Sequence, residues 1–477
     1  MTASAIVVRL IAAGTLLRLG FAWAIGLGID ESYMVAAGRT MRLGYFDHPV
    51  ASWWLSAGAA HLLGSEAPIA VRLPFILLFA ASSWLMFLLT RDTLGERAGV
   101  WAVLAFNLAP VFGVTTGGWV LPDGPLVFCL LGFALSLTRA LAGRGLGWWL
   151  LAGAAAGGAM LSKYSASLVI LGAFAGILAH RDWRKHLATP WPWLAVGVAA
   201  LLFAPVVLWN MQTGWLSISF QASRANAARF NPAGPLIVLA GSAAFLLPWI
   251  WAPAMLAWSR AFRGPGFAPL LACMAAPPVL LFTIVAIWSR QVLFHWPAPG
   301  YLLMFPLLGA LLATWDGRLL RRLTAGTALL LLAALAVVSL EVRTHALGLK
   351  NDPALQAVDW TALRPALAAR GLLNGVIAAP NWSDMGKIDY GIGPGATVIC
   401  LNTDARQYKF TQGAAAHLGQ DILIIAPRQD ATRIAAAYGA VFDSIETLPP
   451  LTADLPGRPG MVFPVFLGHR LRAWPPS

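Results

Sequence analysis

The sequence predicts a polytopic helical membrane protein with a small α/β domain at its C-terminal end. Of its 477 residues, 58% are hydrophobic and only 11% are charged, whereas a soluble globular protein carries about 25% charged residues. Apolar runs close to the length that crosses a bilayer as a helix recur along the chain. A membrane barrel would show short alternating segments instead.

The apolar runs predict about eleven transmembrane helices. In chain order they cover residues 6–28, 71–89, 98–115, 121–138, 147–162, 165–180, 192–209, 235–257, 268–288, 300–314 and 324–341. We expect the first run to be a retained span, because no small-residue cleavage site of a signal peptide precedes the acids that follow it.

Loop charge predicts the orientation of these spans. Arg and Lys are about twice as frequent in the loops on one side as in the short loops on the other, and the richer side is expected to be cytoplasmic. This distribution also accounts for most of the formal net charge of +13, so nucleic-acid binding is not indicated. The loop 29–70 and the segment after residue 342 then face outward, which in a bacterium is the periplasmic side of the inner membrane.

The last part of the chain has a different pattern. The short β-rich runs GVIAAP, ATVICLN, DILIIAP and MVFPVFLG alternate with helical stretches over 354–369 and 431–438, which is typical of an α/β domain. We therefore divide the chain into a membrane domain, 1–342, and an outward α/β domain, 343–477.

The first outward loop, 29–70, carries acids directly at the edge of the membrane. Its pattern predicts short helices over 32–43 and 51–63. Asp30 and Glu31 follow the first apolar run, and Asp47 and His48 lie further along. Ionisable groups at a bilayer edge are costly and are functional by default. The alternative for Asp30 and Glu31 is that they end a helix and face water.

Further polar groups fall at the outward ends of other spans; these are Arg72, Asp123, Lys163, Arg290, His295 and Tyr301. Each alone fits a helix cap or a snorkelling side chain. Together they favour a reaction centre at the outer leaflet over a transport path, which would place polar groups near the midplane as well. Arg18 is the midspan candidate, and we expect it to be a buried pair or to snorkel toward a polar pocket.

Acids and cations together at this depth suit one kind of chemistry. A lipid-borne phosphate is the natural ligand for Arg290, Lys163 and His295, because charge-assisted hydrogen bonds strengthen where water is excluded. A carboxylate can take the proton of an attacking hydroxyl. Glycosyl transfer from a polyprenyl phosphate needs both a base for the acceptor and cations for the departing phosphate.

The residues also resemble a known family. The runs DESYMVAAGRTMRLGYFDHPVASWW, VRLPF, PDGPLVFCLLGFAL, LSKYS and RQVLFHWPAPGY together resemble the bacterial family 39 glycosyltransferases. These belong with the protein O-mannosyltransferases and the lipid A aminoarabinose transferases in the GT-C fold. The resemblance covers roughly residues 1–340.

The resemblance implies roles for individual residues. The family's acid after the first span, taken as the catalytic base or acceptor-orienting carboxylate, matches Asp30, and Glu31 and Tyr33 belong to the same motif. The family's second loop acid matches Asp47. His48 stands where the aminoarabinose branch has Lys, and His is neutral over much of the physiological range.

The resemblance also bears on the donor and on metals. The family's cation near a late outward loop matches Arg290, which is expected on the donor phosphate. Members with a monophosphate donor are thought to need no metal, so we expect neither a metal nor another cofactor.

These observations favour an inverting glycosyltransferase that takes a sugar from a polyprenyl-phosphate-linked donor. Its acceptor would lie in the periplasm or the outer leaflet: lipid A or another lipopolysaccharide, a glycan or a protein. A transporter or flippase of lipid-linked sugars and a non-catalytic scaffold remain alternatives. The sugar and the acceptor are not identified by the sequence. We expect the outward domain to help recognise the acceptor.

Overall fold

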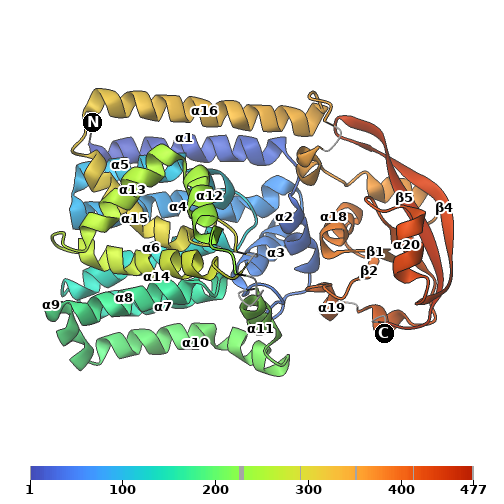
Figure 1. Ribbon diagram of the computed structural model, residues 1–477, viewed down its shortest axis with the longest axis horizontal. Coiled ribbons are helices and arrows are strands. Elements are labelled where there is room, and N and C mark those ends of the chain that lie inside the picture. The colour runs from blue at the N-terminus through green and yellow to red at the C-terminus, as the bar shows by residue number, and fades with distance from the viewer. Residues whose placement is uncertain (1, 225–229, 290–291, 350–351, 412, 475–477) are drawn as a thin grey trace. The chain divides into compact units, whose positions relative to one another are not determined.

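The computed structural model describes residues 2–224, 230–289, 292–349, 352–411 and 413–474 (Figure 1). They form two compact units, and each is described here by itself. The first contains Met1–Leu19, Arg42–Ser52 and Arg72–Ala333, and the second contains Gly20–Met41, Trp53–Val71 and Ala334–Ser477. The division at residue 342 that the sequence suggested stays a prediction.

The first unit is helical. Three long helices, α1 (Ala3–Ala24), α4 (Pro68–Leu94) and α16 (Gly317–Thr344), contribute residues to both units. The other main helices of the first unit are α5 (Glu96–Leu108), α6 (Asp123–Leu141), α7 (Leu146–Ser162), α8 (Ala166–Ala179), α10 (Trp191–Gln212), α11 (Leu216–Ser223), α12 (Gly234–Leu246), α13 (Pro248–Ala261), α14 (Ala268–Val285) and α15 (Ala298–Leu312). Short helices α9 (Arg181–Arg184) and η2 (Lys185–Ala188) join α8 to α10.

Each of the eleven expected apolar segments coincides with a helix or a pair of helices. Within the described residues, six helices are long and apolar enough to cross a membrane, and α12 with α13 makes a seventh if the bent pair is one span. Helices α7, α8 and α15 are apolar but shorter. The chain is therefore a multi-pass membrane protein, while the number of eleven spans stays a prediction.

Two expected spans are interrupted. The helix expected over 235–257 bends by 114° between α12 and α13. The break lies at Leu247, whose φ is +71°, directly before Pro248, because proline disfavours the helical conformation in the residue before it. The helix expected over 98–115 ends at Leu108 and is followed by the π-helix η1 (Val111–Thr116). Each of these two apolar runs is therefore divided between two helices.

Small residues let the membrane helices approach closely. Gly153 and Gly157 of α7 form a GxxxG motif. A side chain at Gly153 would collide with the backbone of Ala195 in α10, and one at Gly157 would press against Ala199 and Leu202 of the same helix. Gly172 and Gly176 repeat this arrangement between α8 and α14. Association in lipid depends on such close packing, because lipid tails are as apolar as the side chains.

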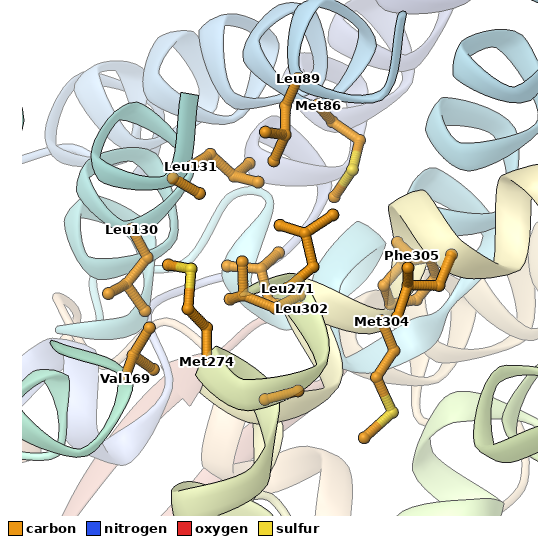
Figure 2. Close-up of a cluster of buried hydrophobic side chains, with 14 of the residues drawn as sticks. Met86, Leu89, Leu130, Leu131, Val169, Leu271, Met274, Leu302, Met304 and Phe305 are labelled. Carbon is orange, nitrogen blue, oxygen red and sulfur yellow. The ribbon is translucent and has the colours of Figure 1, made fainter. Parts of the chain in front are cut away.

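The centre of this unit is filled by aliphatic and thioether side chains. Figure 2 shows buried residues of α4, α6, α8, α14 and α15 that point toward one another; the labelled ones include Met86, Leu130, Val169, Met274 and Leu302. Arg18 is the polar residue that the sequence marked in the middle of a span. Arg18 donates to the carbonyl of Gly113 in η1 and to the side chain of Asn107, so the expected buried pairing is found.

The second unit contains a five-stranded sheet of order β2-β1-β3-β5-β4. The strands are β1 (Val376–Ala379), β2 (Thr397–Cys400), β3 (Ile422–Ile425), β4 (Phe442–Leu455) and β5 (Arg458–Leu471). Strands β1, β2 and β3 pair in parallel, and β5 pairs antiparallel with β3 and β4. Helix α20 (Ala431–Tyr438) packs on this sheet through Ile434 and Tyr438 (Figure 1).

The other helices of this unit are α2 (Ile29–Ala37), most of α3 (Ala51–Leu63), α17 (Leu363–Ala369), α18 (Trp382–Ile392) and α19 (Tyr408–Thr411), with short turns η3 (Pro353–Ala357) and η4 (Ala414–His417). The expected helices over 51–63 and 431–438 are confirmed. The helix expected over 32–43 instead starts at Ile29 and ends at Ala37 before Gly38, and the one expected over 354–369 is split into η3 and α17.

Candidate functional site

Helix α2 presents Asp30 to solvent in its first turn. Asp30 is exposed, whereas every residue from Glu31 to Ala37 is buried. The side chain of Glu31 accepts a hydrogen bond from the backbone N–H of Gly28 at 2.9 Å. Glu31 therefore closes the start of the helix, where an acid is also favoured by the helix dipole. Of the two neighbouring acids, Asp30 is the one that a substrate can reach.

The remaining residues of α2 are packed inside the second unit. The ring of Tyr33 lies 5.3 Å from those of Trp53 and Trp382 and 5.9 Å from that of Tyr408. Its hydroxyl accepts a hydrogen bond from the backbone N–H of Gln407 at 3.0 Å. Tyr33, a site candidate in the sequence, is thus part of the core that supports Asp30.

A partly buried ion-pair network follows the C-terminal end of α2, and Asp389 is its buried member. Arg39 makes two 2.8 Å hydrogen bonds to Glu66 and one of 2.5 Å to Asp389. Tyr408 donates to the other oxygen of Asp389 at 3.1 Å. Burial raises the pKa of Asp389 and holds the pKa of Tyr408 well above its usual range. Burial lowers the pKa of Arg39, but its two carboxylate partners outweigh this and raise it.

In the first unit, the loop that carries Asp47 is fixed against the end of α10 and against α11. Gly44 lies so close to the ring of Trp209 that a side chain there would collide with it. Phe46 packs on Phe220 with ring centroids 4.8 Å apart, and the side chain of Gln221 donates to the backbone carbonyl of Asp47. Asp47 itself is 3% exposed.

Two residues marked in the sequence meet in an ion pair. Lys163 follows α7, and its ammonium lies 3.0 and 3.2 Å from the carboxylate oxygens of Asp123, which begins α6. His295 and His48 also interact electrostatically with Asp123. The structure therefore brings together four of the predicted site residues of this unit. Asp30 and Asp47 belong to different units.

His295 lies in the loop between α14 and α15, where its charge state is set by its surroundings. Burial, with smaller contributions from Lys163 and Arg224, lowers the pKa of His295 to about 4 against the opposing effect of Asp123. The ring is neutral at physiological pH. It can therefore donate a hydrogen bond to a phosphate but does not supply a permanent positive charge.

Arg224 was not singled out by the sequence pattern. It ends α11, and its guanidinium lies 4.6 Å from the ring centroid of Trp296, next to His295. The hydroxyl of Ser289 donates to its backbone carbonyl at 2.7 Å. Tyr164 and Ser217 also join α11 to the end of α7 through a 2.8 Å hydrogen bond. No local pattern in the sequence predicts that the residues after α11 and after α14 lie together.

Three site candidates of the first unit remain, Arg72, Tyr301 and Arg290. Arg72 is buried within α4, and Tyr301 is buried within α15. Arg290, the residue expected on the donor phosphate, lies outside the described residues. Its role stays a prediction.

One group of side chains in the described part of the second unit has the composition of a metal site. Ligand atoms of Glu341, His345 and Asp352 lie within 4.8 Å of one another. Arg458, however, is ion-paired with Asp352 and lies 3.9 Å from Glu341. A metal ion would have to displace this guanidinium, so the geometry favours a structural ion-pair cluster.

Comparisons with known proteins agree with the sequence resemblance. Residues 47–209 match the family model described as dolichyl-phosphate-mannose-protein mannosyltransferase, and this segment includes Asp47, His48, Asp123 and Lys163. Lipid A galacturonosyltransferase RgtD from Rhizobium johnstonii is 24% identical over 305 residues, which cover 60% of this chain and 60% of that relative.

The fold is decided by solved structures. ArnT from Cupriavidus metallidurans bound to undecaprenyl phosphate superposes with a TM-score of 0.67 at 17% identity, over 96% of this chain and 97% of that one. The apo form gives a TM-score of 0.66 at 14% identity, with the same coverage. This chain has the GT-C fold of ArnT. Its predicted relationship to protein mannosyltransferases and to lipid A-modifying transferases is confirmed.

Proposed function

We propose that this protein is an inverting glycosyltransferase with a polyprenyl-phosphate-linked sugar donor and a periplasmic or outer-leaflet acceptor. Two similar proteins support this: one is a lipid A galacturonosyltransferase, and the other was solved with bound undecaprenyl phosphate. We also propose that the protein lies in the bacterial inner membrane, with Asp30 and residues 343–477 facing the periplasm. The excess of Arg and Lys in the opposite loops supports this orientation.

The observation that carries the proposal is the cluster around Lys163. An ammonium, a guanidinium and a neutral imidazole, from Lys163, Arg224 and His295, gather with Asp123 at the ends of membrane helices. Such groups suit a phosphate at the edge of a membrane, because charge-assisted hydrogen bonds are stronger where water is scarce. Arg290 and His48 are proposed to complete this phosphate site, with Asp47 beside it as a donor- or acceptor-binding acid.

In the proposed reaction, Asp30 accepts the proton of the acceptor hydroxyl. The hydroxyl oxygen forms a bond to the anomeric carbon of the sugar as the bond from that carbon to the phosphate oxygen breaks. The polyprenyl phosphate leaves with the electron pair of that bond, and the nearby cations stabilise its charge. A single displacement of this kind inverts the anomeric centre.

The test is transfer by purified protein in detergent. Wild-type protein is incubated with polyprenyl-phosphate-linked uronic acid, hexose and pentose donors and with lipid A as the acceptor, and products are read by mass spectrometry. We expect a glycosylated acceptor and free polyprenyl phosphate in equal amounts. Product without a sealed vesicle excludes a pure transporter. Donor binding without turnover on lipid A, core oligosaccharide, polyprenol or protein acceptors would contradict the proposal.

A further inference from the structure

The helix that carries Asp30 is held by a helix from the distant C-terminal segment. Within the second unit, α18 lies against α2, and three residues of its GKIDY run meet α2 or the backbone on either side of it. Lys387 reaches the backbone before α2, Gly386 faces its middle, and Asp389 binds Arg39 after its end.

Lys387 makes two of the hydrogen bonds that hold this arrangement together. It is 2% exposed, and its ammonium donates to the carbonyl of Leu27 at 2.8 Å and to that of Val358 at 2.7 Å. Leu27 directly precedes Gly28, which starts α2. A buried ammonium persists only where hydrogen bonds replace its hydration, so the cation joins these two backbone segments firmly. Asp30 follows three residues after Leu27.

Close backbone packing adds a second, independent restraint. A side chain on Gly386 would lie 2.8 to 3.0 Å from Tyr33 atoms, and one on Gly26 would lie 2.7 Å from the backbone nitrogen of Asp359. The absence of side chains at these glycines allows α2 and the segment before it to pack directly on the C-terminal segment. The position of the first turn of α2 is therefore set by residues more than 300 positions away in sequence.

We propose that α18 is the positioning element for the acid on α2, with Lys387 and Gly386 as positioning residues that keep Asp30 in its reactive place. This inference rests on the proposed role of Asp30 as the base. It gives the C-terminal segment a part in the chemical step itself, in addition to any recognition of the acceptor. A displacement of about 1 Å at a reacting group can cost about 10²-fold in rate.

The test compares Lys387→Met with Arg428→Gln in the full-length protein. Arg428 is a matched control, because its ion pair with Asp384 stabilises the same helix without any contact to α2. A second variant, Gly386→Ala, should displace α2 while it keeps the charge of Lys387. Its control is Gly375→Ala, because nothing lies within 4 Å of a side chain added at Gly375. For each variant we measure the amide hydrogen exchange of residues 26–32, the KM for the donor and kcat.

We expect Lys387→Met to raise exchange in residues 26–32 and to lower kcat about 10²-fold with donor KM unchanged. Gly386→Ala should act in the same direction, Lys387→Arg should restore part of kcat, and both controls should match the wild type. Wild-type exchange in Lys387→Met and Gly386→Ala would overturn the positioning role. Raised exchange with an unchanged kcat would show that the position of α2 does not affect the rate of sugar transfer.

The proposed role of Asp30 is read from a separate variant. If Asp30→Asn still transfers sugar at the wild-type rate, the base assignment fails, and the positioning proposal fails with it for the chemical step. The exchange data then still show whether α18 restrains α2. The two failures are thus distinguished by different measurements.

Discussion

Two acid-bearing segments of this protein are built in opposite ways. In the second unit, α2 buries everything after its first turn and leaves Asp30 exposed. In the first unit, the loop through Asp47 buries its acid at 3% exposure and fixes its backbone through Gln221. Both segments lie close together in sequence, so the difference comes from what packs against them.

The comparison separates two roles for carboxylates. An exposed acid on a rigid helix can meet a substrate hydroxyl and release a proton to water. A buried acid beside other charges chiefly sets the local field and orients what binds there. We therefore assign proton transfer to Asp30 and binding to Asp47, and the following substitutions break or sharpen that assignment.

The largest expected effect is on the exposed acid. Asp30→Asn removes the base and should lower kcat by about 10² to 10⁴-fold, the usual contribution of general base catalysis. Asp47→Asn should mainly raise the KM of donor or acceptor. Steady-state kinetics of the two purified variants measures both. Equal losses of kcat in both variants would remove the distinction between the two acids.

The support of α2 should be the next most sensitive feature. Arg39→Met leaves Glu66 and Asp389 without their shared cation, so the second unit should lose about 3–5 kcal/mol of stability. The exposed pair of Arg472 and Asp443 is the matched control, and Arg472→Ala should change the thermal unfolding temperature far less. A similar shift in both variants would show that the Arg39 network does not stabilise α2.

The first unit depends instead on close helix packing. Gly153→Ala places a methyl group against the backbone of α10, and overpacking of this kind typically costs about 1–3 kcal/mol. Gly147→Ala lies on the same helix with nothing within 4 Å, so it should be neutral. Thermal unfolding in detergent compares the two. A stable Gly153→Ala variant would contradict the tight α7–α10 contact.

The smallest expected effect concerns how the stability of the folded protein depends on pH. Burial lowers the pKa of His295 to about 4, while the unfolded chain titrates near its ordinary value of about 6.5. Between these values the unfolded state binds more protons, so stability is lost as the pH falls from 6.5 toward 4. His295→Gln should make unfolding less dependent on pH across this window. An unchanged pH dependence would show that His295 is not buried as a neutral ring.

Much of the secondary structure could be predicted because it depends on the pattern of neighbouring residues in the sequence. Apolar length located the membrane helices, and alternating apolar runs located β1, β2, β3 and β5. Strand β4 was missed because Pro449 and Pro450 interrupt its pattern. The bend at Leu247 was missed because an apolar run does not show where a helix breaks.

The site was predicted only in part, for a physical reason. Acids and cations at span ends can be recognised in sequence, but their partners are set by tertiary packing. Lys163 and Asp123 are 40 positions apart, and Arg39 and Asp389 are 350 apart. Lys387 was not singled out, because its partners are backbone carbonyls, which carry no sequence signal.

The central claim is that donor binding and proton transfer depend on different groups, Lys163 and Asp30. It is tested most directly by measuring undecaprenyl phosphate affinity and sugar transfer together in Asp30→Asn and Lys163→Met. The account predicts that Asp30→Asn keeps wild-type lipid affinity with almost no product, whereas Lys163→Met loses affinity. Transfer at the wild-type rate by Asp30→Asn, or lipid affinity unchanged in Lys163→Met, would contradict it.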